Sequence, residues 1–521
     1  MQHRLDFFQR SIAVACLTLA VVGCGNVKRS VSNTYQPQAT PSALPNDLPA
    51  AAIAAASTAV QAAMLAQTEN IPQALIVGTA PAWRATSRLG YAPTAASAQA
   101  AQPNAAVWAL QQLNAAQAAS QKNPNIPADM AGFNAPVDDL AVEFHAYNEA
   151  RKRLRERGPD AKDTEADKAI VEEKFLRETV RTSAAWRVMA CSSLAIEQPL
   201  LAKMTEFWFN HFNVSVTKGP TRAFIGNYAT TLRANALGKF EDLVLASARH
   251  PAMLLYLDQA QSNVRGINEN YARELMELHT LGVGGGYSQA DVRELARILT
   301  GWTVPLAQGK GFAFNPRQHD VGDKVLLGTA FRNNGQKEGE DAIRMLARHP
   351  STAKRITLRM AQTFVSDTPS PALLAQLASF FTRTQGDIHA VMQAIITSPE
   401  FWKPENTLFK TPWDYACSVL TAQGGVKEPR DVQQTLGFLN QAGQPMHAWP
   451  TPDGYKTDAA TWLAPEALTR RADHALTVGG RMAEPAYLQP FLSASSRERI
   501  AREGPAQRSG LLVASPDFMR K

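Results

Sequence analysis

Three histidines are candidates for metal binding or acid–base chemistry. His211 lies in the stretch EFWFNHF, His279 lies in NENYARELMELHTLG, and His319 directly precedes Asp320. Imidazole and carboxylate groups that converge from three separate elements suit a Zn²⁺-like site. They equally suit a metal-free acid–base pair. We therefore take His211, His279 and His319 as candidate ligands of a divalent metal, although no short ligand spacing supports the set.

The stretch from Asn268 to Gly282 is predicted to form a helix with two faces. At about 100° per residue its apolar side chains and His279 share one arc, while Asn270, Arg273 and Glu277 share the other. Glu277 then lies about 160° from His279, so a regular helix cannot offer both to one metal. The polar face is either a solvated surface with an Arg273–Glu277 ion pair, or one wall of a cleft that meets a polar ligand.

The helix predicted around His211 has a similar division. In LLAKMTEFWFNHF, His211 shares a face with Met204 and Phe207, and Glu206 and Asn210 form the adjacent polar stripe. A buried histidine whose ring nitrogens meet backbone carbonyls is the plainer interpretation. The full set of candidate catalytic or ligand-binding residues is Glu206, His211, Asn270, Arg273, Glu277, His319 and Asp320.

The charge distribution argues against a nucleic-acid partner. The 521 residues carry a formal charge of +7, yet 45% are hydrophobic and 19% are charged, which is the balance of a globular protein. Lysines and arginines alternate with acids, as in RKRLRERGPDAKDTEADK (151–168), and such a run is typical of a solvated helix face. The sequence also lacks a Gly-x-Ser-x-Gly nucleophile motif and a phosphate-binding P-loop.

The first residues predict export. Two arginines precede a short apolar run from Ser11 to Val22, which is too short for a permanent membrane span. The following VVGCG resembles a bacterial lipobox, in which the signal segment, residues 1–23, is cut before Cys24 and the thiol is acylated. Gly25, rather than aspartate, after the cysteine favours the outer membrane. We expect a protein that is anchored by lipid and does not span the membrane.

Two further cysteines, Cys191 and Cys417, remain beyond the signal segment and Cys24. An oxidising compartment permits a disulfide between them, but they fit equally well as two buried thiols. Their spacing does not decide between these alternatives.

The rest of the sequence predicts a mostly α-helical protein behind a disordered N-terminal tether. Residues 24–79 are rich in proline, alanine and polar residues, and residues 80–521 are predicted to form one large multi-helix domain. A capping-box pattern at Ser288 and Asp291 predicts one helix start. The segment FAFNPRQHDVGDKVLLG predicts two short strands around a turn, a small β-hairpin near residues 311–328.

Several motifs resemble one bacterial family in order and spacing. They are EFWFNHF (206–212), the block from Asn268 to Trp302, HDVGDKVLLG (319–328), HPSTAKRI (349–356) and GQPMHAWPTPDGY (443–455). The family is catalogued as domain of unknown function 1800, and the resemblance covers roughly residues 80–521. Tyr455 departs from the pattern, since a tryptophan is expected after the glycine. The resemblance implies a mostly helical, exported protein, often encoded beside a second exported family that is similar to sulfatases and alkaline phosphatases.

Together these observations predict a lipid-anchored cell-envelope protein, bound to the outer membrane, that acts with an exported sulfatase- or phosphatase-like partner. The alternative is a hydrolase of envelope or extracellular polymers, built on a His/Glu/Asp site with or without a metal. The enzyme needs its side chains around one cavity, whereas a binding protein needs an exposed patch. The only cofactor that the sequence suggests is a divalent metal.

Overall fold

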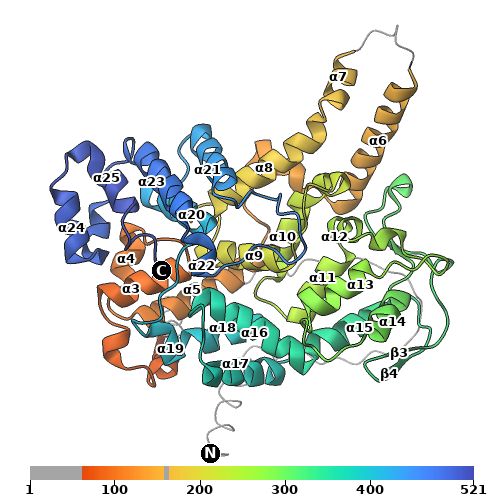
Figure 1. Cartoon of the computed structure of the whole chain (residues 1–521), viewed down its shortest axis with the longest axis horizontal. Helices are drawn as coiled ribbons and strands as arrows, with labels where there is room; N and C mark the ends of the chain where they lie inside the picture. The colour runs from red at the N-terminus through yellow and green to blue at the C-terminus, as the bar shows by residue number, and fades with distance from the viewer. Residues whose placement is uncertain (1–60, 158–163) are drawn as a thin grey trace, which may run out of the picture. The chain divides into compact units, whose positions relative to one another are not determined.

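The structure is a computed structural model that describes residues 61–157 and 164–521. The signal segment, Cys24 and most of the expected tether lie outside these residues. Figure 1 shows that these residues are mostly helical, with two small sheets, so the predicted fold class is confirmed. Within the described residues, no helix combines the length and the apolar character that a membrane crossing requires.

The helices fall into two successive groups along the chain. The first group is η1 (Gln73–Leu75), α3 (Thr79–Arg88), α4 (Ala95–Ala101), α5 (Ala105–Ser120), η2 (Ala128–Asn134), α6 (Val137–Glu156), α7 (Glu165–Val171), α8 (Lys174–Ala190), α9 (Pro199–His211), η3 (Gly219–Ala223), α10 (Ile225–Asn235), α11 (Phe240–Arg249), α12 (Pro251–Tyr256) and η4 (Gln259–Gln261). The second group is α13 (Asn270–Glu274), η5 (Leu275–His279), α14 (Gln289–Ile298), η6 (Leu306–Gln308), α15 (Gln336–Arg348), α16 (Pro350–Phe364), α17 (Pro371–Arg383), α18 (Ile388–Ile396), α19 (Pro399–Trp402), α20 (Pro412–Gln423), α21 (Pro429–Gln441), α22 (Ala459–Trp462), α23 (Pro465–Gly479), η7 (Ala486–Phe491), α24 (Ala494–Ala501) and α25 (Pro505–Val513).

The packed part of the chain begins before residue 80, where the sequence places the start of the domain. Residues 61–68 are helical. Met64, Ile71 and Ile76 are buried in the largest of three hydrophobic clusters. The alanine-rich segment therefore contributes side chains to the core.

Several helix starts follow local sequence signals. Ser288 and Asp291 form the predicted capping box in front of α14. The tetrapeptide Ala-Arg-His-Pro occurs before α12 and again before α16. In both places the histidine ring, His250 or His349, accepts a hydrogen bond from the backbone amide two residues further on. The repeated sequence is therefore a repeated helix start.

The helix predicted over Asn268–Gly282 is irregular. α13 gives way at Leu275 to the π-helical turn η5, so the angles of a regular helix no longer apply. Tyr271 and Met276 are buried as predicted. Thr280, which follows the π-helical turn, is fully buried, and its hydroxyl donates to the Leu275 carbonyl at 2.6 Å.

The β structure consists of two small sheets instead of the single predicted hairpin. β2 (Ala313–Phe314) pairs antiparallel with β1 (Trp302–Thr303), and β3 (Lys324–Leu326) pairs antiparallel with β4 (Thr329–Phe331). The two predicted strands exist, but each pairs with a different segment. Strands of two or three residues present too few side chains for the hydrophobic pattern to specify their partner.

Two large hydrophobic clusters fill most of the described part of the chain, and α9 contributes to both, while Phe133, Trp186 and Ala190 form a third, small cluster. Leu201, Met204 and Trp208 of α9 belong to the larger cluster, which runs through the helices up to α19. Ala202 belongs to the smaller cluster, built mainly by the C-terminal helices α20–α25, which gather together in Figure 1. Ligand pockets occur preferentially at boundaries of this kind.

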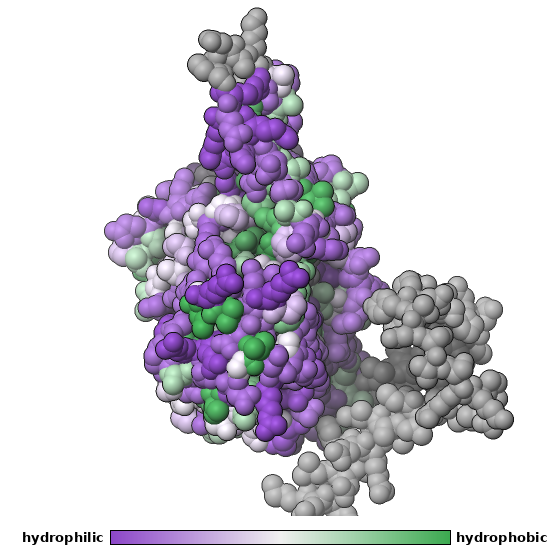
Figure 2. All heavy atoms as spheres, turned by 90° about the vertical axis from the view of Figure 1, so that its right-hand side faces the viewer, coloured by the Kyte–Doolittle hydropathy of each residue, from purple (hydrophilic) through white to green (hydrophobic). Residues whose placement is uncertain are grey.

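The mixed-charge run lies on the projecting ends of α6 and α7. The described residues from Arg151 to Arg157 and from Thr164 to Lys168 are mostly exposed. Figure 2 shows a hydrophilic surface over this end of the two helices. The prediction of a solvated helix face is confirmed for these residues.

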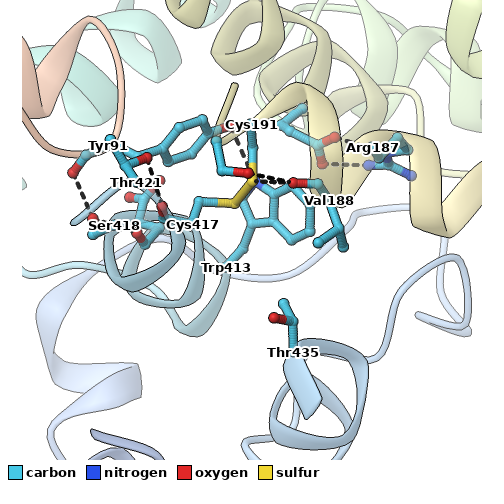
Figure 3. The surroundings of a disulfide bond; sticks show 12 residues. Tyr91, Arg187, Val188, Cys191, Trp413, Cys417, Ser418, Thr421 and Thr435 are labelled. Atoms are coloured by element: carbon cyan, nitrogen blue, oxygen red, sulfur yellow. Dashed lines mark hydrogen bonds and ion pairs between the residues drawn. A yellow bond between two sulfur atoms is a disulfide. The ribbon is translucent and has the colours of Figure 1, made fainter. Parts of the chain in front are cut away.

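A buried disulfide joins Cys191, just after α8, to Cys417 in α20. The two Cα atoms lie 5.7 Å apart, which is a usual separation for bonded cysteines. Figure 3 shows the bond between the two helices, with Tyr91 and Trp413 beside it. Of the two alternatives left open by the sequence, the disulfide is correct, and it ties the smaller hydrophobic cluster to α8.

Candidate functional site

One face of α9 carries the polar residues of that helix. Lys203, Glu206 and Asn210 recur at spacings of three and four residues, so they lie along one side. Their exposed fractions are 4%, 8% and 5%. Charged side chains are seldom buried so completely unless they are paired or serve a function. This face is therefore the starting point for a candidate site.

Two cavities lie along this face, a third adjoins the first, and Tyr455 lines all three. The first, of about 50 Å³, lies between α9, α16 and the start of α20. The second, of about 20 Å³, is lined by Arg187 and His447 as well as Glu206. The third, of about 230 Å³, lies between Arg359 and the loop that follows Asp453. We call the three together the Tyr455 cleft.

The loop of residues 444–458 is fastened to the end of α9 by two asparagines. The Asn210 side chain donates to the Tyr455 carbonyl at 3.0 Å and accepts from the Tyr455 amide at 2.9 Å. The Asn213 side chain donates to the carbonyls of Trp449 and Thr451, at 3.1 and 2.7 Å. The motifs EFWFNHF and GQPMHAWPTPDGY are therefore two halves of one contact.

Gly454 makes this contact possible. Its φ of +70° lies in the left-handed region that favours glycine. A Cβ at this position would overlap both the carbonyl oxygen and the side-chain oxygen of Asn210. The close approach of the loop to α9 thus depends on the missing side chain.

Lys203, Asp414 and Lys521 form a buried ionic group in the first cavity. Lys203 donates to the Gly90 carbonyl at 2.9 Å and to Asp414 at 2.8 Å, and Lys521 donates to the other oxygen of Asp414. Burial lowers the pKa of Lys203 to about 7, against the opposing effect of Asp414. Burial disfavours the charged form of Asp414, but the two lysines outweigh it and lower the pKa of this carboxyl.

A second ionic group forms the wall between the first two cavities. Arg187 binds Glu206 through two parallel hydrogen bonds, one of 2.7 Å, and also donates to His447 Nδ1 at 2.9 Å. Arginine cannot accept a hydrogen bond, so Nδ1 is the acceptor and Nε2 carries the proton. His447 Nε2 then donates to the Ser183 hydroxyl at 3.2 Å. This direction is opposite to that of a histidine that activates a serine nucleophile.

Burial, with Arg187 as a further cause, lowers the pKa of His447 well below its usual value. The imidazole is therefore neutral at physiological pH. This agrees with its single proton on Nε2, and it makes His447 a fixed hydrogen-bonding partner in the wall of the cleft.

Aromatic side chains complete the lining. Trp413 Nε1 donates to the Tyr91 hydroxyl at 3.1 Å, and the Trp413 amide donates to Gln444 at 2.8 Å. Burial raises the pKa of both Tyr91 and Tyr455, so both phenols stay neutral. Aromatic walls with a few fixed polar groups are usual in sites for polar ligands.

His211 and His279 lie together in the core. Their ring centroids are 6.2 Å apart, and His211 Nε2 donates to the His279 carbonyl at 3.0 Å. His211 Nδ1 and His279 Nε2 find no hydrogen-bond partner among the described residues. Burial lowers the pKa of both rings, that of His279 to about 3, and the charges of Arg355 and Arg359 add to the effect. Both histidines are therefore neutral.

The polar face of α13 is a surface stripe. Arg273 pairs with Glu269 at 3.3 Å and with Gln289 at 2.7 Å, so the expected ion pair with Glu277 is replaced by one a turn earlier. The exposed Asn270 donates to a backbone carbonyl at 3.2 Å. Glu277 is half-buried on the π-helical turn, which displaces it from the position that a regular helix gives.

His319 and Asp320 belong to a cluster of ion pairs beside the small sheets. His319 Nε2 lies 3.0 Å from Glu338, whose carboxylate also meets Lys324 at 2.9 Å. Asp320 accepts two hydrogen bonds from Arg297, at 2.8 and 3.2 Å. We call His319, Lys324 and Glu338 the β-insertion triad.

This geometry does not support the metal site suggested by the three histidines. In the part of the chain that the structure describes, no group of three or more His, Cys, Asp or Glu is placed to hold a metal ion. His319 binds Glu338, and His211 binds the backbone at His279. Of the seven candidate site residues, Glu206 lines the Tyr455 cleft, and the other six line none of its three cavities.

A comparison with models of known protein families identifies the family of this chain. The model described as "Protein of unknown function (DUF1800)" matches residues 84–520. The chain belongs to this family. The match contains both motifs that meet at Asn210, and it confirms the resemblance seen in the sequence. No curated protein and no solved structure matches the chain.

Sequence reasoning missed several polar and charged residues of this DUF1800 cleft, among them Arg187, Lys203, Asp414 and His447. A usable signal was present for Lys203, because it stands in the apolar stretch LLAKM and α9 is buried on all sides. A charge inside such a helix must have a partner. Asp414 in PWDYACSVL carries the same signal.

Proposed function

We propose that this DUF1800 protein is an exported, lipid-anchored envelope protein that binds a polar, charged ligand in the Tyr455 cleft. The observation that carries the proposal is the cleft wall, where Lys203, Glu206 and Asp414 are buried and yet border a cavity. Buried ions are costly for stability, and groups with perturbed pKa values in a cleft are concentrated at functional sites.

Two observations support the export part of the proposal. The buried Cys191–Cys417 disulfide is expected in an oxidising compartment and unusual in the cytosol. The sequence VVGCG favours acylation of Cys24, and Gly25 favours the outer membrane.

We also propose that the protein acts with an exported sulfatase- or phosphatase-like partner. The support is the family resemblance, in which members are often encoded beside such a protein. The two lysine side chains of the first cavity suit the same class of sulfated or phosphorylated molecules. The partner and the cleft would then share a ligand.

A hydrolase of envelope or extracellular polymers is the second candidate. Lys203 favours it, because an amine whose pKa is about 7 accepts a proton near neutral pH. Against it, His447 donates to Ser183 instead of receiving its proton, and His319 is held in the β-insertion triad. Binding therefore has the stronger support.

The anchor is tested by cell fractionation of the full chain. Cys24→Ala should release the protein from the membrane fraction, since the acylated thiol is the attachment. Cys191→Ala serves as the matched control, because it removes a cysteine without touching the lipobox and should leave the protein membrane-bound. Sedimentation of Cys24→Ala with the membranes would contradict lipidation.

Ligand binding is tested by thermal unfolding in the presence of the soluble fragments of digested cell envelope. These fragments should raise the melting temperature of the wild type but not that of Tyr455→Ala. Tyr487→Ala is the control, because Tyr487 is a half-buried tyrosine that does not line the cleft. An equal response of all three proteins would refute the assignment of the cleft.

A further inference from the structure

In the first cavity, the lysine side chains outnumber the carboxylates that are available to neutralise them. Asp414 is the common partner of Lys203 and Lys521, and all three side chains are at most 8% exposed. One carboxylate therefore serves two ammonium groups. The neighbouring charge of Lys521 adds to burial in lowering the pKa of Lys203.

Glu206 does not remove this excess. Its two carboxylate oxygens are bound by Arg187 through a two-pronged contact. A carboxylate held in this way by a guanidinium is already neutralised. Glu206 lines the cavity, but its negative charge is compensated from behind.

Two further basic groups lie behind the cavity. Lys410 is fully buried, and its ammonium nitrogen has no hydrogen-bond partner among the described residues. Arg471 is 1% exposed and donates to the Lys410 carbonyl at 2.7 Å. Burial lowers the pKa of Lys410 well below its usual value, and Lys203, Lys521 and Arg471 add to the effect. The cluster is thus too basic for all of its groups to stay protonated.

The start of α20 adds to the positive potential. Thr411 caps this helix, and Thr411, Trp413 and Asp414 line the cavity. The amides of Trp413 and Asp414 are paired with Gln444 and Thr411, and the aligned peptide dipoles still leave partial positive charge at this end of the helix. Helix dipole and lysine side chains therefore act in the same direction.

The size of the cavity limits what can fill it. One water molecule needs a cavity of about 10–15 Å³. The first cavity, of about 50 Å³, therefore admits roughly three to five water-sized groups. A single oxyanion group fits this volume, and a sugar ring does not. The larger cavity of about 230 Å³ shares Gln362, Tyr455 and Thr457 with the first, so a longer molecule can continue into it.

We propose that the cavity between Lys203 and Lys521 binds one oxyanion group, a sulfate, phosphate or carboxylate, of a ligand whose remainder extends past Tyr455 into the larger cavity. The inference rests on the proposed function and gives its ligand a chemical class. Lys203 uses two of its three N–H groups on Gly90 and Asp414, which leaves one for the anion. The anion would supply the negative charge that Asp414 alone does not.

The test uses the full mature chain with its disulfide intact, in chloride buffer. Sodium sulfate, phosphate and acetate are titrated separately at low millimolar concentration and constant ionic strength, and unfolding is followed by calorimetry. At least one anion should raise the melting temperature by on the order of a few degrees, with saturation. The anion with the tightest response identifies the group. General salt effects do not saturate in this range.

Three variants locate the effect. Lys203→Gln and Lys521→Gln should lose the saturable rise, because each replaces a positively charged ammonium group by a neutral amide. Thr363→Met should also lose the saturable rise, because the longer side chain fills the cavity without changing its charge. If Lys203→Gln does not fold, Thr363→Met alone tests whether the anion binds in this cavity. Lys337→Gln is the control, since Lys337 is an exposed lysine paired with Asp341, and it should keep the full response.

Two outcomes would overturn the inference. One is the absence of any saturable rise in the wild type with all three anions. The other is an equal rise in Thr363→Met, Lys203→Gln and Lys337→Gln. If no anion acts while envelope fragments still stabilise the wild type and not Tyr455→Ala, the anion site fails and ligand binding in the cleft stands. If the fragments have no effect either, both proposals fail.

Discussion

The Tyr455 cleft and the β-insertion triad are both buried clusters of ions, but their charges are balanced differently. In the triad, the carboxylate of Glu338 meets Lys324 at 2.9 Å and His319 at 3.0 Å, and the three side chains are at most 2% exposed. None of the cleft's three cavities includes a residue of the triad. In the first cavity of the cleft, two lysines share the carboxylate of Asp414, while the other carboxylate there, Glu206, is bound by Arg187.

The difference separates two uses of buried charge. A cluster whose groups bind one another completely fixes the geometry of the chain, as the triad fixes the β3 segment against α15. A cluster with surplus charge beside a cavity can bind something else. Burial alone does not distinguish the two, because Lys203 of the cleft and Lys324 of the triad are both buried. The test is whether each charge already has its partner.

The largest expected effect comes from removing the carboxylate of the triad. Glu338→Ala leaves the Lys324 ammonium buried without a counter-charge and should lower the free energy of unfolding by about 3–5 kcal/mol. Denaturant titration measures this. Asp341→Ala, on the same helix but with an exposed carboxylate, should change it by about 0–1 kcal/mol. Similar free energies of unfolding for the two variants would show that the triad does not stabilise the fold.

Loss of the disulfide should have the next largest effect on the free energy of unfolding. It should also weaken ligand binding in the cleft. The double variant Cys191→Ala/Cys417→Ala should lower the free energy of unfolding by about 2–5 kcal/mol. Because Trp413 and Asp414 stand on the same helix as Cys417, the stabilisation by anions should weaken too. Calorimetry with and without sulfate and phosphate measures both. Unchanged stability in the double variant would contradict this role.

The surplus charge of the cleft should appear as a dependence of stability on pH. The pKa of Lys203 is about 7 in the folded protein and about 10.5 when unfolded. Between these values the unfolded chain holds a proton that the folded chain has lost, so stability rises with pH, by up to about 1.4 kcal/mol per unit from this group. Lys203→Gln should reduce the slope between pH 7 and 9. An unchanged slope would show that another group, and not Lys203, causes the pH dependence.

The smallest effect is expected at the surface of α13. Arg273 and Glu269 are both more than a third exposed, so Arg273→Ala should change the free energy of unfolding by about 0–1 kcal/mol. Its response to sulfate and phosphate should match the wild type. A loss of anion response in this variant would mean that the polar face of α13 takes part in binding.

The local features of the fold were predictable from the sequence. The capping box at Ser288 needs only neighbouring residues, and so does the buried face that includes Tyr271 and Met276. The π-helical turn at Leu275 was not predictable, because nothing in the residue pattern marks the change of helical period. The strand partners were missed for a similar reason, since pairing of such short strands is set by the surrounding packing.

The candidate site was predictable only in part. Glu206 and Asn210 were placed correctly on one polar stripe, because a stripe is a property of one helix. Their partners are distant in sequence, since Asn210 meets Tyr455 and Lys203 meets Asp414 more than 200 residues away. The balance of charge in the cleft depends on these long-range pairs, and no local pattern contains it.

The disulfide also has a consequence for how the protein is made. Cys191 and Cys417 are separated by 226 residues, and the chain has no other cysteine beyond Cys24. At about 5–20 residues per second, synthesis of that interval takes roughly 10–45 s, during which Cys191 waits as a free thiol. If Cys24 is acylated first, the waiting thiol can meet only its correct partner within the chain. One oxidation event, with no reshuffling of bonds, then completes the protein.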